Sequence, residues 1–136
     1  MLKTNLQEQI TIHALPSKVW KVLTNPEYTR QYLSNFQQED DWLEGGTIHV
    51  ANDPSLVRPL EGHVLESVPG IRLRYAVHEQ KDRPLVLTSY ELIVASEGIE
   101  LKLKCEGFHD SDEDYHRRIQ ATRFILEQVK RLAENG

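Results

Sequence analysis

The sequence predicts an α+β domain in which a curved antiparallel sheet of about six strands grips one long C-terminal helix, with two short helices after the first strand. Three observations support this prediction. Apolar residues alternate with polar ones in several short runs, turn-forming residues separate these runs, and the carboxyl end carries a helical apolar stripe. The apolar face of the sheet and the stripe are the two largest apolar surfaces, so they should pack together. We expect one domain over residues 1–136.

The first predicted elements are a strand and two short helices. Residues 6–13 alternate in polarity and predict a strand. Glu8 occupies one of the positions expected to be apolar, so the pattern does not determine the residue at which the strand starts. Pro16 can begin a helix, because the first turn does not need the N–H that proline lacks. Asn25 and Pro26 then end this helix and begin a second one, with Asn25 as the N-cap and Pro26 in the first position.

Five further strands are predicted between turn signals such as Gly45-Gly46 and Pro69-Gly70. They cover residues 47–51, 60–68, 71–78, 86–95 and 99–106. Alternation is clearest in IRLRYAVH and IELKLKCE, where apolar residues occupy every second position and mostly charged ones lie between them. Because side chains of a strand point alternately to the two faces, this pattern predicts one wet and one dry face of an antiparallel sheet.

A helix of about 20 residues should end the chain. Its apolar stripe recurs at steps of three and four residues and comprises Tyr115, Ile119, Thr122, Leu126, Val129 and Ala133. Ser111 followed by Asp114 resembles a capping box at its start. Phe124 lies nearly opposite the stripe, and it is the best candidate for a homodimer or partner contact.

Composition narrows the classes of partner. Leu, Ile, Val and Phe make up about 28% of the chain, above the roughly 20% below which disorder is common. The net charge of −5 disfavours nucleic acid, and no stretch approaches the roughly 18 apolar residues of a membrane span, so we expect no membrane insertion. The single cysteine, Cys105, should be a buried apolar residue without a cationic neighbour. The N-terminus lacks a signal peptide's apolar core, and we expect a cytoplasmic protein.

Motifs for metals and cofactors are weak. His49 and His63 lie on adjacent predicted strands, but their parity is opposite to that of the apolar residues, so both should face water. Residues 109–116 imitate the start of a calcium loop, yet Tyr115 and Ala121 occupy the positions where that loop needs Gly and Glu. A solvated acidic helix start is the better interpretation. We expect no metal, no cofactor and no catalytic residue from the motifs present.

Several stretches in register resemble the START-like (SRPBCC) superfamily, and within it the bacterial homologues of the activator of the heat-shock ATPase. They are PSKVWKVLTNPEYTRQYL, WLEGGTI, GHVLESVPGIRLRY, residues 89–108 and ILEQVKRLAE, which together cover most of the chain. The resemblance implies a helix-grip fold with a mostly apolar cavity between the sheet and the long helix. Members of this type often carry Gly-Trp where this chain has Ala121-Thr122. A threonine there should leave extra space, unless another side chain fills it.

The leading functional hypothesis is that this cavity binds a small apolar molecule, lipid-like or polyketide-like. The residues expected to contact it are Val64, Glu66, Leu73, Tyr75, Tyr90, Leu92, Leu101, Leu103, Ile119, Thr122 and Leu126. One alternative is a protein-interaction module that stimulates a heat-shock ATPase. Another is a cyclase or hydratase in which Tyr75 or Tyr90 works with an inward histidine or with Glu66, if that carboxylate is buried with a raised pKa. Trp20 should pack its helix on the sheet, whereas Trp42 could be a lid.

Overall fold

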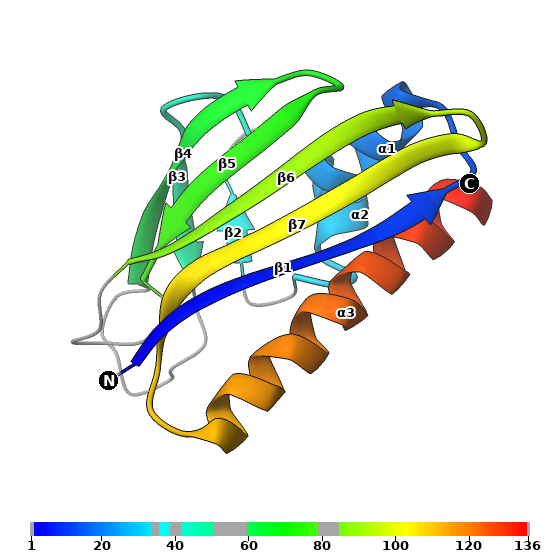
Figure 1. Cartoon of the computed structure of the whole chain (residues 1–136). Coiled ribbons are helices and arrows are strands. Elements are labelled where there is room, and N and C mark those ends of the chain that lie inside the picture. The colour runs from blue at the N-terminus through cyan, green and yellow to red at the C-terminus, as the bar shows by residue number, and fades with distance from the viewer. Residues whose placement is uncertain (1, 34–35, 39–41, 51–59, 79–84, 136) are drawn as a thin grey trace.

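A strongly curved antiparallel sheet carries the helices on its inner face (Figure 1). The computed structural model describes residues 2–33, 36–38, 42–50, 60–78 and 85–135. Its elements are β1 (Leu2–Ile12), α1 (Pro16–Thr24), α2 (Pro26–Thr29), β2 (Phe36–Gln38), β3 (Thr47–Val50), β4 (Leu60–Val68), β5 (Arg72–Val77), β6 (Val86–Ala95), β7 (Gly98–His109) and α3 (Asp112–Asn135). The α+β helix-grip architecture is therefore confirmed.

The strand order is β1-β7-β6-β5-β4-β3-β2, so β1 and β2 are the edges of the sheet within the described residues. Consecutive strands from β2 to β7 are neighbours, whereas β1 crosses over to pair with the last strand. The sheet has one strand more than predicted. β2 has only three residues, which is too short for an alternating pattern to be recognised.

The predicted dry face is the inner face of the sheet. In β5, Leu73, Tyr75 and Val77 are buried, while Arg72 and Arg74 point outward. β7 alternates in the same way and buries Leu101, Leu103 and Cys105. Figure 1 shows α3 running lengthwise along this sheet beside β1. None of the described helices is long and apolar enough to cross a membrane.

β4 departs from simple alternation. Val64 pairs with Tyr75 on the inner face, but the register then shifts by one residue and Glu66 pairs with Arg74. A bulge of this kind adds one residue to one strand and reverses the parity beyond it. Glu66 consequently lies on the outer face, where its carboxylate forms an ion pair with Arg72. The expectation of a buried Glu66 on the parity of Val64 is wrong for this reason.

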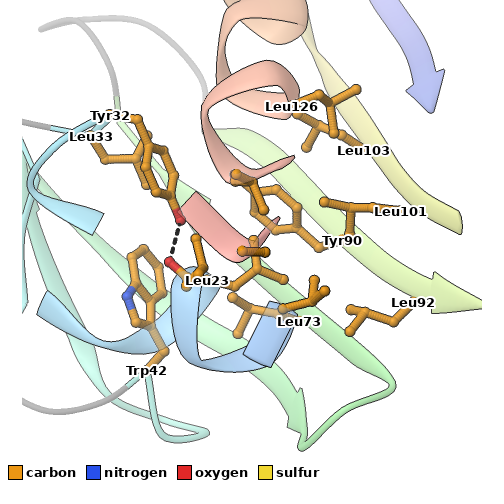
Figure 2. Close-up of a cluster of buried hydrophobic side chains, with 14 of the residues drawn as sticks. Leu23, Tyr32, Leu33, Trp42, Leu73, Tyr90, Leu92, Leu101, Leu103 and Leu126 are labelled. Carbon is orange, nitrogen blue, oxygen red and sulfur yellow. Dashed lines mark hydrogen bonds between the residues drawn. The ribbon is translucent and has the colours of Figure 1, made fainter. Parts of the chain in front are cut away.

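The junction of α1 and α2 is stabilised by two side chains. The Asn25 side-chain oxygen accepts a hydrogen bond from the Glu27 N–H at 2.9 Å, which confirms the predicted N-cap. Pro26 has no N–H, so it cannot donate to the carbonyl of Val22, four residues earlier. The Tyr32 hydroxyl takes this place and donates to the Val22 carbonyl oxygen at 2.7 Å (Figure 2).

The ends of α3 are held differently. At its start, the Ser111 hydroxyl accepts a hydrogen bond from the Asp114 N–H at 3.1 Å, as the capping pattern predicts. Near its end, Glu134 accepts a hydrogen bond from the backbone N–H of His13 at 2.8 Å and a second from Lys130 at 2.6 Å. Lys130 also donates to the backbone carbonyl of Thr11 at 2.8 Å. The last turns of α3 are thereby bound to the end of β1.

The middle of β1 carries a charge on its inner parity. Glu8 is opposite Leu103 in the register of β1 and β7, and the strand begins at Leu2, before the predicted start. The Glu8 carboxylate reaches the Arg123 Nε on α3 at 3.2 Å. An edge strand tolerates this arrangement because its side chains can reach water and the flank of the helix.

Candidate functional site

A row of aromatic side chains crosses the inner face of the sheet. The ring centroids of Trp42 and Tyr75 are 4.8 Å apart, and those of Tyr75 and Tyr90 are 6.3 Å apart. Both spacings fall within the range of favourable aromatic pairs. Trp42 is only 1% exposed and packs within the large cluster of buried side chains. Its backbone adopts a left-handed conformation with φ of 58°, which is uncommon for a residue other than glycine and is not predicted by the residue type.

Tyr90 is the chemically unusual member of this row. Figure 2 shows its ring projecting from the sheet toward α3, near Leu101, Leu103 and Leu126. Its hydroxyl oxygen is buried and has no described hydrogen-bond partner of ordinary geometry. Burial is the largest cause and raises the pKa of Tyr90 well above its usual value, while the nearby Tyr75 side chain acts in the opposite direction. Because the contact with Tyr75 lacks hydrogen-bond geometry, we regard it as a weak polar contact.

Tyr32 provides a contrast within the same core. It is also buried, and burial raises the pKa of its hydroxyl well above the usual value. Its hydroxyl nevertheless has a partner, the carbonyl oxygen of Val22 described above. Of these two buried phenols, Tyr32 has a good hydrogen bond, whereas the Tyr90 hydroxyl has no partner of ordinary geometry.

The predicted binding residues divide among several places. Most belong to one large cluster of buried side chains, which we call the main cluster and which contains Val64, Leu73, Tyr75, Tyr90, Leu92, Leu101, Leu103 and Leu126. Ile119 is half-buried against a second, smaller cluster of Leu6, Val86 and Cys105. Thr122 is buried on α3. Glu66 alone is removed from the inner face by the bulge.

Two buried threonines accompany the apolar residues of β6 and α3. Thr88 precedes Tyr90 on the inner parity of β6 and is buried, and Thr122 is buried on the stripe of α3. The Thr122 hydroxyl donates to the carbonyl oxygen of Arg118 at 2.9 Å. Cys105, a member of the small cluster, pairs with Thr88 across the strands.

The sequence interpretation missed Arg118. The Nη1 atom of this side chain lies 3.9 Å from the Cys105 Sγ, so the thiol has the cationic neighbour that its strand pattern did not predict. Arg118 lies next to Ile119 and four residues before Thr122, on the border of the apolar stripe. A long side chain at such a border can turn inward, and this position was the available signal.

The remaining candidate residues lie away from the inner core. His63 on β4 is exposed, as predicted. On β3 the side chain of Ile48 is buried, so its neighbour His49 lies on the outer face of the sheet, which also agrees with the prediction. His109 shares a hydrogen bond of 2.6 Å with the Thr4 hydroxyl. Among the residues that the structure describes, no group of three or more His, Cys, Asp or Glu side chains is placed to hold a metal ion.

A curved sheet that grips a C-terminal helix is the architecture that the resemblance to the START-like superfamily implies. The chain belongs to the family described as activator of Hsp90 ATPase homolog 1-like protein, whose family model matches residues 13–134. No curated protein matches the chain significantly.

Solved structures share this fold. Protein CV1439 from Chromobacterium violaceum is 24% identical, covers 96% of each chain and gives a TM-score of 0.76. Protein BH1534 from Bacillus halodurans is 14% identical, with coverage of 98% of this chain and 100% of that one and a TM-score of 0.77. The Aha1 dimer from Colwellia psychrerythraea is 18% identical over 96% of each chain, with a TM-score of 0.73. At such identities the likeness establishes the fold alone.

Proposed function

We propose that the protein binds a small apolar molecule between the inner face of the sheet and α3. The observation that carries the proposal is the buried Tyr90 hydroxyl, which has no hydrogen-bond partner of ordinary geometry inside an apolar layer. A buried unpaired hydroxyl costs roughly 1–3 kcal/mol, so a ligand oxygen that accepts its proton would recover this loss. The aromatic row beside it offers the apolar surface that such a ligand needs.

Thr122 supplies the second support and the means of a test. It is buried on the face of α3 that meets the sheet. We expect the extra volume of Thr122→Trp to occupy the ligand's place. Thr122→Val is the matched control, because it keeps the volume and removes only the hydroxyl that bonds to the helix backbone.

The experiment is a titration of the purified, folded protein with the fluorescent apolar probe 1-anilinonaphthalene-8-sulfonate under native conditions. We expect saturable binding to the wild type and to Thr122→Val, and its loss in Thr122→Trp with the far-UV circular dichroism unchanged. A wild-type protein that is folded but binds neither this probe nor an aliphatic ligand would refute the proposal.

Family membership favours a second candidate function, stimulation of a heat-shock ATPase through the protein surface. Such a contact would not use the interior, so Thr122→Trp should leave it intact. ATPase turnover measured with the purified heat-shock protein, with and without this variant, separates the two candidates. A cyclase or hydratase mechanism has less support, because Glu66 lies on the outer face and cannot pair with Tyr75 or Tyr90 inside.

A further inference from the structure

We propose that the outer face of the sheet docks an acidic segment of a partner protein, with one carboxylate of that segment held between Arg74 of β5 and Lys104 of β7. This face is turned away from α3 and the main cluster, so the inference is independent of the proposed function. It depends on how charged side chains are arranged in two neighbouring rows across the strands.

The first row has its own anion. Arg72, Glu91 and Lys102 are partly exposed at outward positions of three adjacent strands, and the register places Glu91 opposite both cations. Directly opposite side chains in an antiparallel sheet lie about 5 Å apart at their Cβ atoms, and opposite charges there stabilise the pairing. This row therefore balances its charges with side chains of the sheet itself.

The second row has two cations and no anion between them. Ser89 is opposite both Lys104 and Arg74, and all three are partly exposed on the outer face. Glu66 is opposite Arg74 across β4 and β5, but its carboxylate forms an ion pair with Arg72 of the first row. The Ser89 hydroxyl can donate a hydrogen bond, yet it carries no charge. A carboxylate from another molecule, placed above Ser89, would give this row the same order of charges as the first.

Both cations of the second row are accessible to such a carboxylate. The Lys104 ammonium is 3.1 Å from the Glu106 carboxylate, and these side chains are 43% and 36% exposed. An exposed pair of this kind contributes little to stability, so sharing the ammonium with a second carboxylate costs little. Neither this ion pair nor the one between Arg72 and Glu66 includes Arg74. A guanidinium can bind a carboxylate through two parallel hydrogen bonds, which makes Arg74 the main contact.

Apolar side chains beside the second row favour a peptide over a free anion. Leu65 is the extra residue of the β4 bulge, next to the residue opposite Arg74, and it is 49% exposed. Leu87 precedes Ser89 on the outward positions of β6 and is partly exposed. An extended segment with an acidic and an apolar residue two positions apart presents both to this face, because alternate side chains point the same way. Since the net charge of the chain is −5, local cations such as these determine where an acidic segment can approach.

The test is an NMR titration of the purified, isotope-labelled protein with two capped peptides, GSESLSEG and its neutral counterpart GSQSLSQG. We expect the acidic peptide to shift the amide resonances of Arg74, Ser89 and Lys104 in a saturable way at low ionic strength. The neutral peptide should bind at least about tenfold more weakly, because it lacks the charge-assisted hydrogen bonds. Added salt should weaken the binding of the acidic peptide, since the contacts are exposed.

Four variants locate the contact. Arg74→Gln should weaken binding of the acidic peptide about two- to fivefold, as expected for the loss of one exposed ion pair. Ser89→Glu places a carboxylate between the two cations and should weaken binding at least as much, whereas Ser89→Gln, of equal size, should retain most of the affinity. Arg117→Gln is the matched control, because Arg117 is 69% exposed on α3 and its loss removes the same charge away from this face.

Equal affinities for the two peptides, or no binding of the acidic one, would overturn the inference, as would resonance shifts confined to other parts of the protein. A folded Arg74→Gln protein that binds the acidic peptide as tightly as the wild type would also overturn it. Inorganic phosphate that bound this row as tightly as the peptide would indicate a site for free oxyanions and overturn the assignment to a protein segment. Binding of the apolar probe to the interior is measured separately, so none of these results bears on the proposed function.

Discussion

Two buried tyrosines should respond to the same substitution with opposite signs. Tyr90→Phe removes a hydroxyl that is buried without a good hydrogen bond, whereas Tyr32→Phe removes one that donates to the Val22 carbonyl. In the ligand-free protein, the first change should stabilise the fold by about 1 kcal/mol. This is the lower end of the usual cost of an unpaired buried hydroxyl, because Tyr75 offers weak compensation.

Tyr32→Phe should instead destabilise the fold by about 1–3 kcal/mol. The variant loses one hydrogen bond and also leaves the Val22 carbonyl without a donor, since Pro26 has no N–H. Urea unfolding of the refolded proteins, followed by tryptophan fluorescence and circular dichroism, measures both changes against the wild type. If Tyr90→Phe destabilised the protein as much as Tyr32→Phe, the Tyr90 hydroxyl would have a strong internal partner and the reasoning would fail.

Three further predictions concern packing, pH and association. Gly62→Ala should destabilise the fold by at least about 3 kcal/mol, because its new Cβ would collide with the backbone of Ala76 and Val77. Gly45→Ala meets open space and should cost only about 1 kcal/mol, from the left-handed backbone that an alanine would have to adopt. Urea unfolding compares the two variants. Hydrogen bonds from His13 and Lys130 hold the pKa of Glu134 below its ordinary 4.5. The contribution of Glu134 to the stability of the fold is therefore complete above pH 4.5, and it is lost as the pH falls through the lower pKa of the folded state. Glu134→Gln should therefore lower the free energy of unfolding at neutral pH by less than about 1 kcal/mol and make the loss of stability in acid less steep. An acid unfolding curve identical to that of the wild type, measured by circular dichroism, would contradict this. We also propose that Phe124, which is 50% exposed on α3, contributes to a homodimer; Phe124→Ser should then shift sedimentation toward the monomer, and an unaltered profile would contradict the contact.

Sequence periodicity predicted the fold because the sheet has one dry face. The strict alternation of β5 and β7 and the stripe of α3 correspond to surfaces that are buried on one side only. The bulge after Val64 could not be predicted in this way. Side chains still alternate on both sides of it, but beyond the bulge each one lies on the opposite face of the sheet from the one that simple alternation predicts. The burial of Trp42 depends on a left-handed backbone angle that no periodicity reveals.

The candidate site was predicted less completely for a similar reason. Parity was sufficient to place Tyr75 and Tyr90 on the inner face, and both are buried there. The missing hydrogen bond of Tyr90 is a matter of distances between side chains, which depend on rotamers and not on spacing. The inward turn of Arg118 is likewise a choice that a long flexible side chain makes in three dimensions.

The pairing of β1 with β7 also affects how the protein is made. β1 is synthesised first, yet its neighbour in the sheet is the last strand, with Leu2 opposite His109. During translation β1 cannot form this pairing until β7 has left the ribosome, and closing so long a loop is slow. Nascent chains that stop before β7 should therefore keep both β1 and β6 as open edges, and they are the species that we expect to aggregate or to need a chaperone.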